Sequence, residues 1–144
     1  MNFDVNNFLN AQASGVYEMA LEEIKNGQKM SHWMWYIFPQ IKGLGWSWMA
    51  QKFEIPTIED AKEYYANDIL RKRLIEISEA VYNLDSDIHY IFGSPDDLKF
   101  KSCMTLFALI APNERIFKRN LDKFYNGEYC EHTTKLYIEE MRNN

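Results

Sequence analysis

Cysteine, glycine and proline are all scarce in this sequence, with two, six and four residues respectively among 144. Two cysteines, Cys103 and Cys130, are too few for the disulfide framework of a small secreted domain. The few glycines, together with a charged fraction of 26%, exclude a disordered or low-complexity chain. A chain of this length fits one domain over residues 1–144, which can bury a core without disulfides or metals.

Long apolar runs are missing as well. No run approaches the roughly 20 residues that are needed to span a bilayer. Residues 1–8 also lack the basic stretch, followed by an apolar one, that marks a secretory signal. We therefore expect a cytoplasmic protein with no membrane partner.

Positive charge is in short supply, since 16 basic residues stand against 21 acidic ones and give a net charge of -5. This balance argues against a broad nucleic-acid surface, which needs basic side chains to displace counterions from phosphates. A local basic pocket is compatible with it. The histidines and cysteines show none of the usual metal-ligand spacings, and Gly43-Leu44-Gly45 lacks the third glycine of a dinucleotide-binding motif. We expect neither a metal nor a cofactor.

Aromatic side chains, by contrast, are abundant and concentrated. Residues 31–53 hold all four tryptophans, and polar side chains such as Ser31, His32, Gln40 and Lys42 stand among the rings. Buried Trp and Tyr bring hydrogen-bond donors that need partners. This stretch is therefore predicted to form core, pocket wall or both, and to be the site of the protein's function.

Apolar side chains recur at three- and four-residue spacing along most of the chain, which predicts helices. Residues 4–26 form either one helix or two that separate at Ser14-Gly15. Further helices are predicted over 31–38, 47–53, 58–66, 68–84, 87–92, 96–110 and 113–125, and from Thr133 onward. Ser31, Ser47 and Thr57 are the expected N-caps. No segment shows the two-residue alternation of strands, so the predicted fold is all-α, a compact irregular array of about seven to nine short helices.

Several motifs together resemble a known family. The run Ser-His-Trp-Met-Trp-Tyr-Ile-Phe-Pro-Gln at 31–40, the sequence Gly-Leu-Gly at 43–45, and the segments 91–93 and 104–107 closely resemble the DUF1810 family, also called the Rv1873-like family. The resemblance extends from Ala11 to Gly127. It implies an all-α fold comparable with armadillo-like helical arrays, and it implies no settled activity. The chain departs from the family pattern at Asn67-Asp68, where we expect His-Pro, and at Cys103, where we expect serine.

Helix 96–110 is apolar nearly all round, yet it carries a polar stripe of Lys99, Ser102 and Thr105 at three-residue spacing. One interpretation is that this stripe faces the tryptophan-rich segment across a pocket. The other is that the hydroxyls bond back to helix carbonyls while the lysine extends to solvent. In the first case the pocket would offer a cation, hydroxyls, an imidazole and flat rings to an anionic, ring-bearing ligand. The candidate ligand-binding residues are Ser31, His32, Trp33, Trp35, Phe38, Gln40, Lys42, Lys99 and Ser102.

Three functions follow from these features. The preferred one is a small-molecule binding domain for a nucleotide or an ADP-ribose-type metabolite, stacked on Trp33 or Trp35 with its charge met by Lys42 or Lys99. The second is a protein-interaction module that presents the tryptophans in an exposed groove. The third is an enzyme that acts on a similar ligand, with His32 as general base and Lys99 as electrostatic stabiliser.

Overall fold

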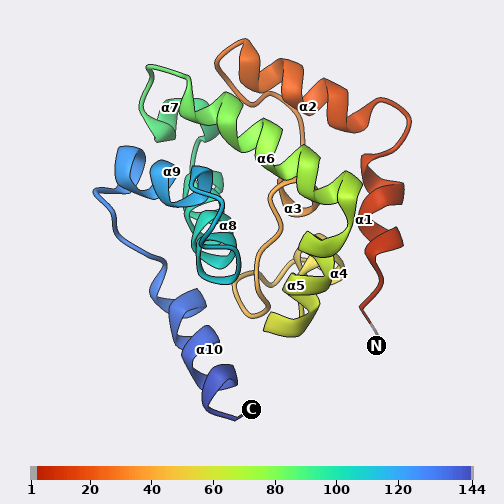
Figure 1. Cartoon of the computed structure of the whole chain (residues 1–144). Coiled ribbons are helices and arrows are strands. Elements are labelled where there is room, and N and C mark those ends of the chain that lie inside the picture. The colour runs from red at the N-terminus through yellow and green to blue at the C-terminus, as the bar shows by residue number, and fades with distance from the viewer. Residues whose placement is uncertain (1–2, 144) are drawn as a thin grey trace.

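Figure 1 shows the computed structural model of the chain, in which residues 3–143 are described. The helices are α1 (Val5–Gln12), α2 (Val16–Lys25), α3 (Met34–Ile37), α4 (Trp48–Phe53), α5 (Ile58–Ala66), α6 (Asp68–Tyr82), α7 (Ile88–Phe92), α8 (Asp96–Ile110), α9 (Ile116–Tyr125) and α10 (Glu131–Arg142). Within this described part of the chain the only β pairing is one isolated bridge between Ile41 and Ile55. The predicted all-α class is confirmed.

The helix count is higher than predicted, with ten helices among residues 3–143 against about seven to nine expected from periodicity. One added helix comes from the 4–26 segment, which separates into α1 and α2. Ser14 and Gly15 there adopt φ values of 58° and 85°, in the left-handed region that a continuous helix does not use. The sequence was compatible with one helix or two over residues 4–26, and the structure has two.

Two of the predicted N-caps, Ser47 and Thr57, are confirmed. Ser47 Oγ accepts from the Ala50 amide at 3.1 Å, and Thr57 Oγ1 accepts from the Asp60 amide at 3.1 Å. The predicted cap at Ser31 is wrong, because α3 starts after Trp33 without a side-chain cap. The last helix starts at Glu131, two residues earlier than predicted.

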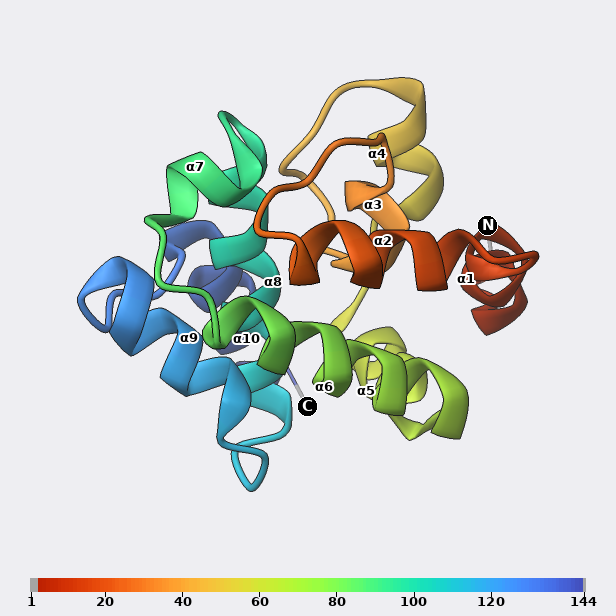
Figure 2. The ribbon, with the colours of Figure 1, turned by 90° about the horizontal axis from the view of Figure 1, so that it is seen from above.

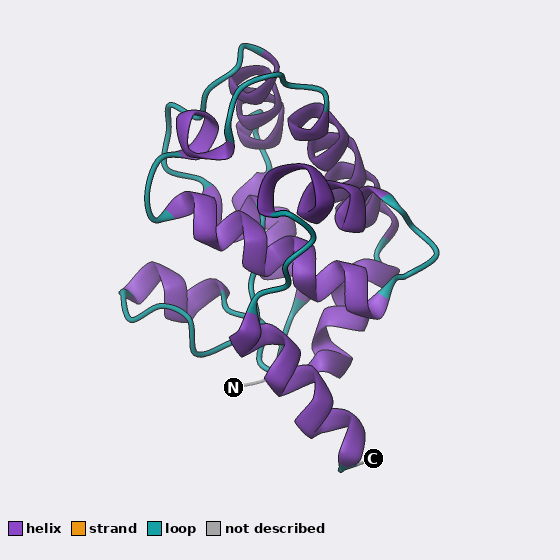
Figure 3. Ribbon diagram, turned by 90° about the vertical axis from the view of Figure 1, so that its left-hand side faces the viewer, coloured by secondary structure: helices purple, strands orange, loops and turns teal. Residues whose placement is uncertain are grey.

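Helix α9 packs against both α6 and α8 and so links the two longest helices. In the view from above, α6 lies between α2 and α9 (Figure 2). Helix α8 lies against α9 and also contacts α5, α7 and α10. Helix α10 extends away from the rest of the molecule at the C-terminal end, in both Figure 1 and Figure 3.

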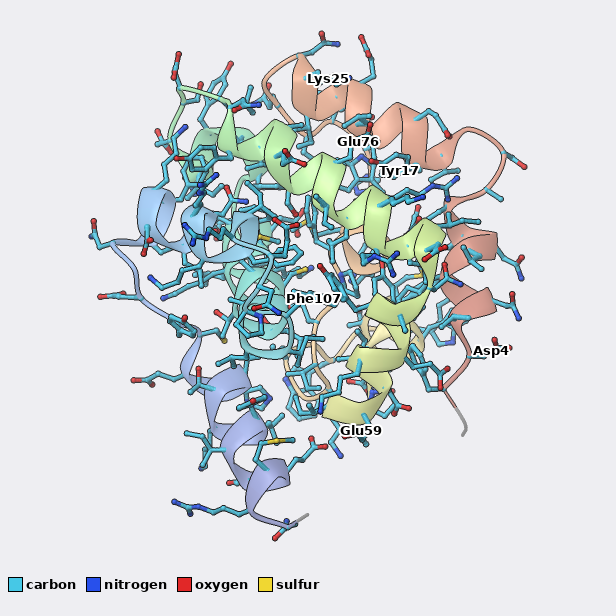
Figure 4. The ribbon with its side chains drawn as sticks, in the orientation of Figure 1. Asp4, Tyr17, Lys25, Glu59, Glu76 and Phe107 are labelled. Atoms are coloured by element: carbon cyan, nitrogen blue, oxygen red, sulfur yellow. The ribbon has the colours of Figure 1, made fainter. Side chains whose placement is uncertain are left out.

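The core is built on α8, as its apolar sequence predicts. Phe107 lies at the centre of the molecule in Figure 4 and packs against Tyr64 and Phe117, with ring centroids 5.6 and 5.7 Å away. On the far side of α6, Tyr17 of α2 donates to Glu76 Oε1 at 2.6 Å, and Figure 4 shows the two side chains together. This bond joins α2 to α6, and burial with the adjacent carboxylate raises the pKa of Tyr17.

The long connection between α3 and α4 is held in place by backbone hydrogen bonds. The Lys42 amide donates to the Ile55 carbonyl at 2.9 Å, and the Ile55 amide donates to the Gln40 carbonyl at 2.8 Å. Ile41 and Ile55 are both buried by this pairing. These hydrogen bonds fix the position of the connection between α3 and α4. No helix within residues 3–143 has the length and apolar character needed to cross a bilayer.

The turn that leads into α3 is fixed by one carboxylate. Glu23 Oε1 accepts from the amides of Met30 and Ser31 at 2.7 and 2.8 Å and from Trp33 Nε1 at 3.0 Å, while Oε2 accepts from Ser31 Oγ at 2.6 Å. Burial by itself would raise the pKa of Glu23, but these hydrogen bonds outweigh burial and hold the pKa below its ordinary value of 4.5. Ser31 therefore serves the fold through its bond to Glu23.

Replacing Glu23 with alanine should leave the hydrogen-bond donors of Met30, Ser31 and Trp33 without their acceptor. We expect Glu23→Ala to lower the free energy of unfolding by about 2–3 kcal/mol in chemical denaturation. Glu22→Ala, at an exposed position of the same helix, should change it by less than about 0.5 kcal/mol. Equal losses in the two variants would contradict this assignment.

The Glu23→Ala variant should also differ from the unmodified protein in how its stability depends on pH. Because the pKa of Glu23 is lowered on folding, its charged form stabilises the protein above pH 4.5, and this contribution is lost as the pH falls below that value. The stability of the unmodified protein should therefore fall more steeply than that of Glu23→Ala between about pH 5 and pH 3.

Candidate functional site

A groove of about 790 Å³ opens between the first half of α8, the α3–α4 connection and the segment before α10. Its volume lies in the range of about 300–1,000 Å³ that is usual for small-molecule sites. We call it the α8 groove. Its lining residues are Gln40 and Leu44 from the connection, Pro95, Leu98, Lys99, Lys101 and Ser102 around α8, and Glu128, Tyr129, Cys130 and Glu131 before and at the start of α10.

The wall formed by α8 is fixed by hydroxyl groups. Ser102 Oγ lies 3.0 Å from Thr133 Oγ1, which joins α8 to α10 beneath the groove. Thr105 Oγ1 donates to the Lys101 carbonyl at 2.8 Å and accepts from the Cys130 amide at 2.9 Å. The back-bonding interpretation of the polar stripe thus holds for Thr105, whereas Ser102 bonds across to another helix.

The opposite wall is tied to α10 by a histidine. His132 Nε2 lies 2.9 Å from the Lys42 carbonyl oxygen. At the neighbouring Gly43, φ is +93° and a Cβ would come within 3.0 Å of the same imidazole nitrogen. Only glycine fits this position without strain or displacement, which gives Gly43 a structural role.

One carboxylate at the start of α8 serves two lysines. Asp96 Oδ2 lies 2.9 Å from Lys29 Nζ, and Asp96 Oδ1 lies 3.3 Å from Lys99 Nζ. The Lys29 side chain is only 8% exposed and packs over the Trp33 ring at 5.2 Å, while Lys99 Nζ lies 5.0 Å from the Trp35 centroid. The two ammonium groups share this carboxylate, and Asp97, next to it in the first turn of α8, adds a second negative charge there.

A third lysine, Lys101, lines the groove on the same helix. Lys101 Nζ is 3.6 Å from a carboxylate oxygen of Glu128, whose side chain is 72% exposed, so solvent screens the pair strongly. Glu131 lies on the same side of the groove as Glu128. The groove is therefore positive along α8 and negative along the segment before α10.

The structure brings together only part of the predicted set. Gln40, Lys99 and Ser102 line the α8 groove. Trp35 is half-buried under Lys99 and lines a separate cavity of about 20 Å³, a volume sufficient for one water and too small for a ring-bearing ligand. Stacking of a ligand on Trp35 would therefore require the lysine to move.

The remaining candidates lie elsewhere. Trp33 and Phe38 are fully buried in the core, where Trp33 donates to Glu23. His32 and Lys42 are exposed, and neither lines the groove. The expectation that Trp33 stacks on a ligand is therefore corrected: its indole is sealed between helices by packing and by its hydrogen bond.

The sequence analysis missed the third wall and the buried ion pair. Tyr129, Cys130 and Lys101 line the groove, and Lys29 and Asp96 set its charge. Lys101 follows a buried phenylalanine and lies off the stripe that was singled out. Tyr129 and Cys130 lie in an irregular segment without periodicity. The one available signal was Lys29 close to the aromatic stretch, which by itself does not reveal a partner 67 residues away.

Comparison with known proteins gives a consistent result. The model of the family described as "Protein of unknown function (DUF1810)" matches residues 2–137. A crystal structure of the conserved hypothetical protein Rv1873 from Mycobacterium tuberculosis is similar, with 41% identity, a TM-score of 0.90, and coverage of 93% of this chain and 96% of that one. The comparison with curated proteins gave no match.

The shared carboxylate predicts an asymmetry between two variants. Asp96→Asn should lower the free energy of unfolding by about 2–4 kcal/mol, because it leaves a nearly buried ammonium without its counter-charge. Lys29→Met should cost less, below about 1.5 kcal/mol, since Asp96 keeps Lys99 and the methionine retains the contact with Trp33. Urea denaturation measures both, with Asp85→Asn at an exposed position as control. The reverse order would contradict the proposed charge sharing.

Proposed function

We propose that this chain, which belongs to the DUF1810 family, binds a small anionic, ring-bearing ligand such as a nucleotide or an ADP-ribose-type metabolite in the α8 groove. The observation that carries the proposal is the charge of the groove wall. Lys99 and Lys101 both line the groove, Lys99 shares Asp96 with Lys29, and Lys101 has only a screened partner, so each of these two ammonium groups can bind an anionic group in a volume of ligand size.

The lining of the groove combines charged and apolar side chains, which supports a ligand with two unlike parts. Phosphate or carboxylate oxygens would lie against Lys99 and Lys101 on α8. A ring would lie against the apolar surfaces of Leu44, Leu98 and Tyr129. A ribose hydroxyl or ring amine could reach the carboxylates of Glu128 and Glu131. This combination matches a nucleotide better than a simple anion.

The other two functions receive less support. An enzyme with His32 as base requires the imidazole to face the ligand, and His32 is exposed outside the groove. An interaction module that uses Trp33 requires that ring at the surface, but it is fully buried, and the exposed Trp46 and Trp48 do not line the groove. We also propose that the protein acts in the cytoplasm, where its free thiols Cys103 and Cys130 would stay reduced.

Thermal unfolding with a ligand panel tests the proposal. Nucleotides, ADP-ribose, sugar phosphates and uncharged nucleosides should be compared at equal concentration. At about a hundredfold excess over Kd, a ligand of the correct class should raise Tm by roughly 5–10 °C, while the uncharged nucleosides should not. Lys99→Gln and Lys101→Gln should each reduce this ligand-induced shift, measured from the Tm of the variant itself. Lys62→Gln, on an exposed part of α5, should leave it unchanged.

Cys130 supplies an independent readout, because its side chain lines the groove. The correct ligand should slow its reaction with a thiol reagent. Cys103 should stay unreactive throughout, since it is fully buried and burial raises the pKa of its thiol. An unchanged Tm with every ligand class, together with an unprotected Cys130, would overturn the proposal.

A further inference from the structure

Two tryptophans of the aromatic stretch are displayed on the surface. Trp46 is 90% exposed and Trp48 is 71% exposed, although large aromatic side chains normally bury most of their area. Neither of them lines the α8 groove. Their exposure is therefore unexplained by the core and by the proposed ligand site. We call residues 42–52 the tryptophan loop.

The backbone that carries these rings is held in place. Gln51 Nε2 donates to the Trp46 carbonyl at 3.1 Å, and Ser47 caps the helix that follows. At Gly45, a Cβ would come within 2.6 Å of the Ala50 Cβ, so the two ends of the turn are in close contact. Figure 2 shows this connection into α4 at the outer edge of the molecule. The two indoles thus project from anchored backbone, Trp46 from the end of the α3–α4 connection and Trp48 from the first residue of α4.

The tryptophan loop has a charge opposite to that of the whole protein. Residues 42–52 contain Lys42 and Lys52 and no acidic residue, in a chain with a net charge of -5. Glu54 lies just beyond them, and its Oε1 accepts from the Gly43 amide at 3.2 Å. Both lysines are exposed, and Lys52 Nζ lies 5.0 Å from the Trp48 ring centroid. The loop therefore combines two exposed indole rings with two exposed lysines, of which Lys52 lies beside the Trp48 ring.

We propose that the tryptophan loop docks onto the surface of a bilayer that contains anionic lipids. Indole rings are favoured at the level of the lipid headgroups, where the apolar ring is buried and its N–H stays near water. Lysines beside them are attracted to negatively charged headgroups. This contact is peripheral. It revises the expectation of no membrane partner, which was based only on the absence of a spanning run and a secretory signal.

A lipid surface fits these residues better than nucleic acid does. Two lysines can neutralise only two phosphates, and the remaining acidic surface would repel a polyanion that wraps the protein. A bilayer makes contact at the projecting edge alone, within about one Debye length, and leaves the rest of the acidic surface away from the headgroups. The proposal does not depend on a ligand in the α8 groove.

Vesicle binding tests the proposal with the full chain. We expect the protein to co-sediment with phosphatidylcholine vesicles that contain about 30 mol% phosphatidylserine, and its tryptophan emission to shift to shorter wavelength. Binding to pure phosphatidylcholine should be several-fold weaker, and about 0.5 M salt should weaken binding to the anionic vesicles.

Substitutions in the tryptophan loop test whether vesicle binding depends on it. The double variant Trp46→Ala and Trp48→Ala should lose about tenfold or more in partitioning. Lys42→Glu with Lys52→Glu should lose binding to anionic vesicles specifically. Ile69→Ala, at a half-exposed position at the start of α6, should bind normally. Circular dichroism and Tm confirm that each variant is folded.

Three outcomes would overturn the proposal. The first is the absence of co-sedimentation and of an emission shift with anionic vesicles. The second is equal binding by the tryptophan double variant. The third is a concentration-dependent emission shift without lipid, lost in the double variant, with no further shift on adding vesicles, since the rings would then pack against a second copy of the chain. None of these results bears on the ligand-induced Tm shift, so the two proposals fail separately.

Discussion

Asp96 is the residue on which the arrangement of the groove depends. A nearly buried Lys29 requires a counter-charge, because an unpaired ammonium in that position would cost several kcal/mol. Asp96 supplies it and thereby places the start of α8 beside the turn that follows α2. The same carboxylate is close enough to hold Lys99 over Trp35. The charge of the groove wall is therefore a consequence of a bond that the fold needs for its own stability.

The other walls are fixed in the same way, by buried polar groups that must find partners. Thr133 meets Ser102 beneath the groove, and the paired backbone of Ile41 and Ile55 holds the α3–α4 connection. His132 joins that connection to α10 at Lys42. None of these bonds requires a ligand. Together they hold a concave surface open between three segments, which is the preorganisation that small-molecule binding favours.

The sequence was sufficient for most of the fold because its signals are local. Ser47 and Thr57 begin their helices, and α5 and α8 have the predicted bounds, since caps, prolines and three- and four-residue spacing act within a few residues. Ser31 was wrongly predicted to cap a helix, because its hydroxyl donates instead to the carboxylate of Glu23 on α2.

The site was predicted less well for the same physical reason. Lys99, Ser102 and Gln40, which line the groove, were singled out because they interrupt apolar patterns. Tyr129 and Cys130 reach the groove through a tertiary contact that no local pattern records. The tryptophans were treated as one group, yet Trp33 is sealed in the core while Trp46 is at the surface. Which face of a short segment is buried depends on its neighbours, and composition does not contain that information.

The most direct test of the central claim is a crystal structure of the protein purified from its own cells without added ligand. The account predicts electron density in the α8 groove, with an anionic group near Lys99 and Lys101 and a ring against Tyr129. A groove that holds only solvent, with Leu98 and Tyr129 closed across it, or a retained ligand bound elsewhere, would contradict it.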